Sequence, residues 1–460
     1  MKKRVSYILS FVAVLLLAAC NPGKGVFSVD GTKPVSLENR IIYQLNVGAF
    51  TDEGTFKAAE GQLARLDTLG VDILWLMPIY PRGETMHSPY ASMDFYNVNP
   101  AYGTVGDLKA FVSAAHEHGM KVWLDWVPNH VAVENPWVES HPEYFTKDAK
   151  GEMIHPHGWG DVYELNYQEP GLVDAMNRAL KFWIDETDID GFRCDYVSSP
   201  TIPVKYWQQI IAELKSYKSG KEIEFLSETD ISNRHNIRID SCGFDYDYAW
   251  DFQGRLAWKF KDAEGADSLK AICDEFLNAT KQIKNRRMVY LTNHDQNYND
   301  GGHTLKDFYG DNRYALTVLE FTFYGMPLLY QGQEIGDPDT LNYFTDAKVK
   351  WNMIDRKMQN TVRTLVALHH IQPSLAADAP VEYLETNKAQ VLAYKRDNVL
   401  VVLNLGKEPT EVQVNGIDGN YQQWINSETI SRGIGLTDVQ LSSSAPISIH
   451  GKGYLVYVKK

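Results

Sequence analysis

Eight short apolar runs constrain the fold of this chain more than any other feature of its sequence. They lie at residues 41–47, 71–79, 121–127, 189–195, 223–228, 244–250, 288–294 and 326–332, and each has the composition of a buried β-strand. Segments with apolar residues at helical spacing separate most of them, and two such segments end in Gly70 and Gly119, which are typical helix C-caps. No helix is evident between the fifth and sixth runs. The alternation predicts an α/β fold, a (β/α)8 TIM barrel, with a doubly wound open sheet as the alternative.

Two segments depart from this alternation. Residues 130–171 are polar, rich in histidine and tryptophan and without a clear period, which predicts a small excursion domain (domain B) after the third strand. After residue 376 the chain changes to short β runs separated by turn residues, which predicts a C-terminal antiparallel β-sandwich over 376–460. The barrel is then expected to comprise residues 38–129 and 172–375.

The N-terminus has the pattern of a targeting segment. Residues 1–19 begin with three basic residues and continue with an apolar stretch that is short for a membrane span. The stretch LAAC resembles the lipobox of bacterial lipoproteins, in which Cys20 would become the lipidated N-terminus; a plain signal peptide cleaved near Ala19 is the alternative. Residues 20–37 have the composition of a tether. The pattern predicts an exported bacterial lipoprotein anchored in a membrane, on the periplasmic or surface side of the outer membrane.

The charge and the cysteines exclude several classes of function. The net charge is −14 and becomes −17 without residues 1–19, whose three charged residues are all basic. An acidic chain argues against nucleic acid and anionic membrane as partners, so membrane contact is expected only through the lipid anchor, and a neutral substrate fits better. Cys194, Cys242 and Cys273 are odd in number and have no metal-site spacing, which predicts buried free thiols. The sequence carries no signal for an oligomeric state.

Ionisable residues gather where the predicted strands end. The third run ends in DWVPNH (125–130), the fourth in RCD (193–195), the fifth in SE (227–228) and the seventh in TNHD (292–295). Because catalytic groups of a barrel come from the C-terminal ends of its strands, carboxylates, an arginine and two histidines should meet at one rim. Two carboxylates that flank a glycosidic bond can act as nucleophile and as acid/base.

The spacing of these residues suggests separate protonation states. Arg193 and Asp195 lie two positions apart on one face of a strand, so the arginine should lower the pKa of Asp195 and keep it anionic. Glu228, which follows Leu226 and Ser227, would keep its proton if it is partly desolvated. Asp295 could bind sugar hydroxyls and balance the charge of an oxocarbenium ion.

These stretches are similar to the signatures of the α-amylase family of glycoside hydrolases (glycoside hydrolase family 13). DWVPNH, GFRCDYV, FLSET and YLTNHDQ resemble its four main signatures in order and spacing, and FYGMPLLYQGQEIG (323–336) resembles its eighth-strand signature. HSPYASMDFYNVNPAYGT (87–104) looks like the family's loop after strand two, and ELNYQEP (164–170) like the end of its domain B. The resemblance runs from about Arg40 to the C-terminus, and with the lipobox it indicates a bacterial lipoprotein member.

The resemblance implies a retaining mechanism on α-glucosidic bonds. Asp195 would be the nucleophile, Glu228 the acid/base, and Asp295 would stabilise the transition state. The attacking and donating carboxyls should lie roughly 5–5.5 Å apart. The residues that the resemblance places around the sugar are Tyr90, which would stack under it, and His130, Arg193 and His294.

The family pattern also bears on metal binding and on the leaving-group side of the cleavage point. The family often binds calcium between barrel and domain B, so Asn129 and Asp161 are candidate ligands, although Ca²⁺ takes six to eight oxygens and Asn129 could equally be a loop hydrogen-bonder. No organic cofactor is expected. Many true α-amylases carry Lys-His at the positions of Ser198 and Ser199, so this chain should differ on the leaving-group side of the cut.

The sequence therefore predicts a retaining hydrolase of α-1,4-glucosidic bonds in starch, glycogen or maltodextrins. A glucanotransferase, or an activity like that of cyclomaltodextrinase or neopullulanase on the same scaffold, is one alternative. A glycan-binding lipoprotein without catalysis is another.

Overall fold

The computed structural model describes residues 28–229, 239–260, 265–281, 283, 285–299, 302–376 and 379–460. The predicted signal peptide, Cys20, part of the tether and part of the segment between the fifth and sixth strands lie outside these residues. Among the described residues, no helix combines the length and the apolar composition that crossing a membrane requires.

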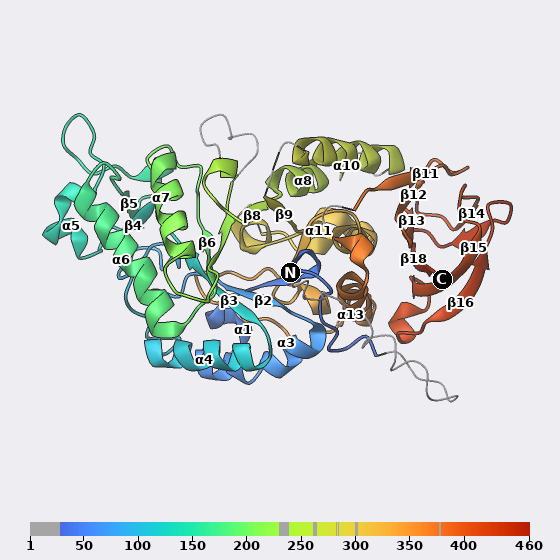
Figure 1. Cartoon of the computed structure of the whole chain (residues 1–460), viewed down its shortest axis with the longest axis horizontal. Helices are drawn as coiled ribbons and strands as arrows, with labels where there is room; N and C mark the ends of the chain where they lie inside the picture. The colour runs from blue at the N-terminus through green and yellow to red at the C-terminus, as the bar shows by residue number, and fades with distance from the viewer. Residues whose placement is uncertain are drawn as a thin grey trace, which may run out of the picture.

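Eight parallel strands form a closed barrel (Figure 1). They are β1 (Ile42–Leu45), β2 (Ile73–Leu76), β3 (Lys121–Trp126), β6 (Gly191–Cys194), β7 (Glu224–Ser227), β8 (Tyr246–Tyr248), β9 (Arg286–Val289) and β10 (Met326–Tyr330). Each strand pairs with the next along the chain, and β10 pairs with β1 to close the ring. The predicted TIM barrel is thus confirmed and the open sheet is wrong.

Most of the described helices cover the outside of the barrel, one short helix lies in the excursion after β3, and large side chains fill the barrel interior (Figure 1). The helices are α1 (Val47–Phe50), α2 (Phe56–Glu60), α3 (Leu63–Leu69), α4 (Val105–Glu117), α5 (Trp137–Ser140), α6 (Pro170–Thr187), α7 (Val204–Lys215), α8 (Trp250–Arg255), α10 (Ala266–Thr280), α11 (Leu305–Tyr309), α12 (Arg313–Thr322) and α13 (Arg356–Ile371). Inside the barrel, Trp75, Trp123 and Tyr246 pack in one buried cluster. Since side chains alternate along a strand, Arg193 points into this interior while Cys194 packs among the outer helices. Cys194, Cys242 and Cys273 are buried free thiols, as predicted.

Two parts of the chain extend the barrel at opposite ends of the long axis (Figure 1). After β3 the chain leaves the barrel and forms an antiparallel pair, β4 (His130–Ala132) with β5 (Val162–Glu164), before it returns in α6. The C-terminal strands are β11 (Glu382–Leu384), β12 (Val391–Arg396), β13 (Val399–Asn404), β14 (Thr410–Val412), β15 (Gly419–Asn426), β16 (Thr437–Leu441), β17 (Ile447–Ile449) and β18 (Tyr454–Lys459). Side chains of the six-stranded sheet and of the β14–β17 pair pack together in one buried cluster. This arrangement is the predicted sandwich.

The seventh barrel strand is shorter at its C-terminal end than predicted. It ends at Val289, not at His294. Beyond it, side chains replace the strand ladder: the Leu291 N–H donates to the buried carboxyl of Glu320, and the Leu291 carbonyl accepts from the Tyr309 hydroxyl and the Gln253 amide. The chain is therefore free to turn away from the sheet, and Asp295 begins a short π-helical turn, η7 (Asp295–Asn299).

Candidate active site

A cleft of about 730 Å³ opens where the barrel strands end. It brings together most of the predicted site residues, namely Tyr90, His130, Asp161, Asp195, Glu228, His294 and Asp295. Its other walls come from residues that the sequence did not single out, among them Met86, Trp159, Tyr196, Trp250, Tyr343 and Phe344. Arg193 and Asn129 are not part of its lining.

Arg193 lies beneath the cleft and organises its carboxylates. Its Nη1 lies 2.9 Å from Asp125 Oδ1 and 2.8 Å from Asp195 Oδ1, and its Nη2 lies 2.9 Å from Glu228 Oε2. Its Nε donates to the Tyr248 hydroxyl at 3.0 Å. The side chain is fully buried and does not line the cleft, so Arg193 acts on the cleft through the carboxyl groups that it contacts, and its predicted contact with sugar stays a prediction.

Burial gives the two central carboxyls different pKa values. Desolvation raises the pKa of Glu228 to about 8, Arg193 opposes this, and the nearby Asp195 and Asp295 raise it further. Desolvation also raises the pKa of Asp195 to about 6 against the effect of Arg193. The sequence predicted a lowered pKa for Asp195; the arginine does act in that direction, but it is shared with Asp125 and Glu228 and burial outweighs it. The predicted order, with Glu228 the weaker acid, is unchanged.

The backbone after β6 holds Glu228 in place. The amide of Tyr196 donates to Glu228 Oε2 at 2.8 Å, and the Glu228 amide donates to the Cys194 carbonyl at 3.0 Å. Tyr196 has a φ of 42°, in the left-handed region that non-glycine residues rarely adopt. The backbone conformation of Tyr196 therefore directs its N–H toward the carboxyl group of Glu228.

A hydrogen-bonded chain supports the opposite side of the cleft. The Tyr90 hydroxyl lies 3.2 Å from Asp125 Oδ2 and 2.6 Å from His294 Nε2, and the Tyr90 and His294 rings stack at 5.2 Å. Gln44 Nε2 donates to His294 Nδ1 at 2.7 Å, which leaves the ring proton on Nε2. Burial lowers the pKa of His294 to about 4, so the ring is neutral near pH 7. This side thus presents uncharged rings, which suit an uncharged sugar.

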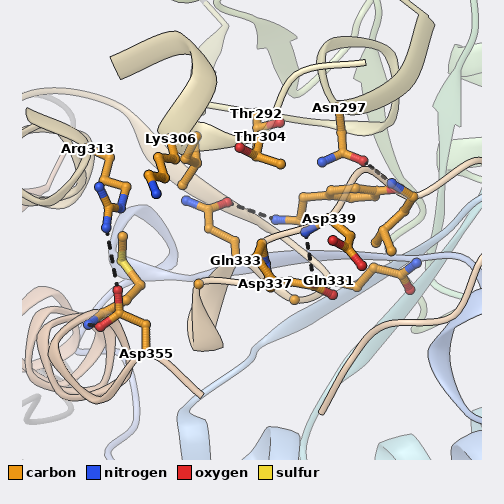
Figure 2. Close-up of a pocket in the computed structure, with 17 residues that line it drawn as sticks. Thr292, Asn297, Thr304, Lys306, Arg313, Gln331, Gln333, Asp337, Asp339 and Asp355 are labelled. Atoms are coloured by element: carbon orange, nitrogen blue, oxygen red, sulfur yellow. Dashed lines mark hydrogen bonds and ion pairs between the residues drawn. The ribbon is translucent and has the colours of Figure 1, made fainter. Parts of the chain in front are cut away.

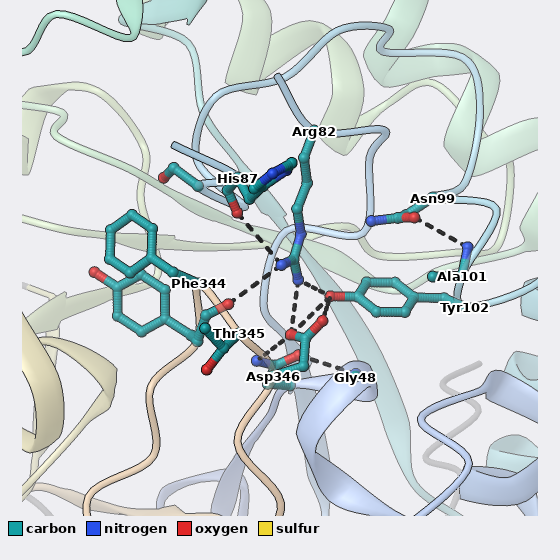
Figure 3. A network of polar contacts seen from close by, with 12 residues as sticks. Gly48, Arg82, His87, Asn99, Ala101, Tyr102, Phe344, Thr345 and Asp346 are labelled. Carbon is teal, nitrogen blue, oxygen red and sulfur yellow. Dashed lines mark hydrogen bonds and ion pairs between the residues drawn. The ribbon is translucent and has the colours of Figure 1, made fainter. Parts of the chain in front are cut away.

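One arginine joins the two loops that form this wall (Figure 3). Arg82, on the loop after β2, forms an ion pair of 2.8 Å with Asp346 and donates to the carbonyls of His87 and Tyr343. Asp346 also accepts from the Asn46 amide and from the Tyr102 hydroxyl, which itself bonds to Arg82. The loop that carries Tyr343 into the cleft is therefore fixed to the loop that carries Tyr90.

The predicted calcium ligands do not come together. At the ends of the antiparallel β4–β5 pair, Asn129 lies opposite Leu165 and Asp161 lies opposite Val133. Four residues along a strand separate the two positions, or about 13 Å at ~3.3 Å per residue. The Asn129 amide oxygen is buried without a hydrogen-bond partner, but a single oxygen is far from the six to eight that Ca²⁺ takes. Asn129 and Asp161 therefore do not form one calcium site together, and calcium binding itself stays a prediction.

A second cavity of about 220 Å³ lies between the loop after β10 and helices α11 to α13 (Figure 2). Its carboxylates are occupied by backbone and cationic partners. Asp337 accepts from the amides of Asp339 and Lys350, and Asp355 caps α13 and lies 3.7 Å from Arg313. We assign no reaction to it.

Some of the missed residues had a signal in the sequence and others had none. Gln44 interrupts the apolar run IIYQLNV, and a buried amide in a barrel strand needs a partner, which is His294. Tyr343 and Phe344 follow the eighth strand by more than ten residues, so only the folded loop brings them to the cleft.

The fold and the cleft agree with the comparison to known protein families. The family profile "Alpha amylase, catalytic domain" matches residues 38–164 and 158–367. The chain therefore belongs to the alpha-amylase family.

Individual relatives carry several different names. The chain is 29% identical over 422 residues to alpha-amylase MalA of Haloarcula japonica, which covers 84% of this chain and 58% of that protein. It is 28% identical over 354 residues to malto-oligosyltrehalose trehalohydrolase of Saccharolobus solfataricus, over 69% of this chain and 60% of that protein. The chain thus spans about three-fifths of the length of these curated relatives. A solved structure, the noncanonic maltogenic alpha-amylase AmyB of Thermotoga neapolitana, aligns with a TM-score of 0.75 and 27% identity over 92% of this chain and 99% of that one.

Proposed function

We propose that this protein is a retaining glycoside hydrolase that cleaves α-1,4-glucosidic bonds of starch, glycogen or maltodextrins. The observation that carries the proposal is the pair of carboxyls on Arg193, of which Glu228 keeps its proton more strongly than Asp195. A nucleophilic carboxylate beside a protonated carboxyl is what hydrolysis with retention requires. The neutral aromatic wall and the membership of the alpha-amylase family support an α-glucan as the substrate.

The reaction would proceed in two steps. The Asp195 carboxylate attacks the anomeric carbon, the bond to the leaving oxygen breaks, and the Glu228 proton passes to that oxygen. Glu228, now ionised, then takes a proton from water, whose oxygen attacks the same carbon and releases Asp195. Asp295, which lines the cleft beside His294, would bind sugar hydroxyls and balance the positive charge of both transition states.

A product time course tests this proposal. The protein without residues 1–20 would be incubated with maltoheptaose, starch, pullulan and a cyclodextrin, and both the chain lengths and the anomeric form of new ends would be followed. Shorter products with new α-anomeric ends support a retaining hydrolase. Longer chains would instead show a glucanotransferase, and no reaction on any of the four would contradict the proposal.

The two pKa values predict a bell-shaped dependence of kcat/KM on pH. Activity should rise as Asp195 loses its proton near pH 6 and fall as Glu228 loses its proton near pH 8. The control is α-maltosyl fluoride, because fluoride leaves without a proton. With that substrate the acid limb should remain and the alkaline limb should disappear; an alkaline limb shared by both substrates would contradict the assignment of Glu228.

The location of the protein in the cell is a separate proposal, which depends on N-terminal residues outside the described part of the chain. The LAAC stretch supports a lipoprotein that is exported and held in a bacterial membrane through Cys20. Cys20→Ala should move the protein from the membrane fraction to the soluble fraction of cells that express it. A variant that stays in the membrane fraction would contradict lipidation at this residue.

A further inference from the structure

Trp159 is an exposed aromatic side chain on one wall of the cleft. It lines the cleft together with Gly158 and Gly160, and 46% of its surface is exposed. When a ligand covers a water-exposed tryptophan ring in a concave site, apolar surface is buried, and this favours binding. The flat face of the indole suits the apolar face of a sugar ring.

The backbone is shaped to present this ring. Trp159 follows a short 3₁₀ turn, Pro156–Gly158, in which His157 (φ 53°) and Gly158 (φ 78°) are both left-handed. A ring nitrogen of His155 bonds to the Val162 carbonyl at 2.9 Å and closes the loop. A non-glycine residue held in the left-handed region is costly, and such positions concentrate at functional sites.

Ring contacts place Trp159 between His130, whose ring lies 5.6 Å away, and the side of the cleft that carries Glu228. Trp159 lies 4.8 Å from the His157 ring, and His157 lies 5.2 Å from the Tyr196 ring. The Tyr196 amide in turn holds Glu228, the group that would give its proton to the leaving sugar. On the other wall, Tyr343 packs against the stacked Tyr90–His294 pair, where the sugar to be attacked would bind.

Among the described residues, the two serines that follow Asp195 by three and four positions offer this side neither a charge nor a ring. Ser199 is buried and its hydroxyl bonds to Thr201 at 2.9 Å. Ser198 lines the cleft, but it has neither a charge nor a ring. We propose that Trp159, with Tyr196, is the platform that binds the sugar on the leaving-group side, and so selects longer α-glucans and binds sugar acceptors. This inference rests on the proposed hydrolase function.

Two substrates separate the platform from the rest of the site. Maltohexaose has a sugar on the leaving-group side, whereas α-maltosyl fluoride has only fluoride there. For Trp159→Ala, kcat/KM on maltohexaose should fall about ten-fold, the scale of one lost stacking contact, while kcat/KM on α-maltosyl fluoride stays within about two-fold of the wild type. Trp159→Phe should keep part of the activity on maltohexaose.

Acceptor use gives a second readout. With α-maltosyl fluoride as donor and added maltose as acceptor, Trp159→Ala should lower the ratio of transfer to hydrolysis. Trp258→Ala is the matched control, because Trp258 is 53% exposed, packs edge-on against Phe308 and is not part of the cleft lining. This control should change none of these values.

Three results would overturn the inference: equal losses on both substrates, no loss on either, or the same effect in Trp258→Ala. A wild-type protein inactive on both substrates would instead contradict the proposed function. In that case a fluorescence titration with maltotriose decides about the platform, since Trp159→Phe should remove the part of the quenching that comes from Trp159, while Trp250, which also lines the cleft, still responds. Unchanged quenching would then refute the platform itself.

Discussion

Asp195→Asn is expected to lower kcat on maltoheptaose by about 10⁴-fold or more, the scale of losing an active-site nucleophile. The amide has the size of the carboxylate but cannot form a stable ester with the anomeric carbon. Asp195 is buried and accepts from Arg193, and the amide oxygen of asparagine can keep that hydrogen bond. The fold and the affinity for glucans should therefore remain, and single-turnover kinetics with circular dichroism would measure both.

The matched control for this variant is Asp337→Asn. Asp337 is a partly buried aspartate at the second cavity and accepts from two backbone amides. It should keep nearly full activity. Substantial turnover by Asp195→Asn, or an equal loss in Asp337→Asn, would refute the role of Asp195 as nucleophile.

Glu228→Gln is expected to lower kcat/KM on maltoheptaose by about 10²–10⁴-fold, the usual contribution of general acid catalysis. Glutamine can still accept from the Tyr196 amide, so the local structure should hold, but it has no proton to give to the leaving oxygen. Because fluoride leaves without that proton, kcat/KM on α-maltosyl fluoride should fall far less.

Chemical rescue provides the check on the second step. Azide attacks without a general base, so adding it to Glu228→Gln with α-maltosyl fluoride should raise kcat and yield an α-maltosyl azide. Equal losses of kcat/KM on both substrates, without rescue, would mean that Glu228 has a structural role.

The fold was predictable because its signals are local and repeat. Each barrel strand is an apolar run followed by polar residues, and eight such repeats leave few other architectures. The end of β9 was not predictable in the same way. TNHD continues an apolar run, and only the folded chain brings the Glu320 carboxyl to the Leu291 amide, where the ladder stops.

The site was predictable where its residues end strands. Asp195 and Glu228 directly follow β6 and β7, so their convergence required only the barrel. The pKa of Asp195 was not predictable, because a sequence shows the neighbouring arginine but neither the burial nor the other carboxylates that share it. The distance between Asn129 and Asp161 was not predictable either, because it depends on the register of the β4–β5 pair.

The Arg82–Asp346 pair has a consequence for how this cleft can change over time. The Arg82 guanidinium contacts carbonyl groups and a carboxylate on two loops that are far apart in sequence. Replacing only one of these loops would therefore leave a buried charge without its partner. We expect natural variants and engineered chimaeras to inherit the two loops together. New substrate preferences would then arise more readily on the opposite wall, because the turn that carries Trp159 is held by a hydrogen bond within its own segment, from His155 to Val162.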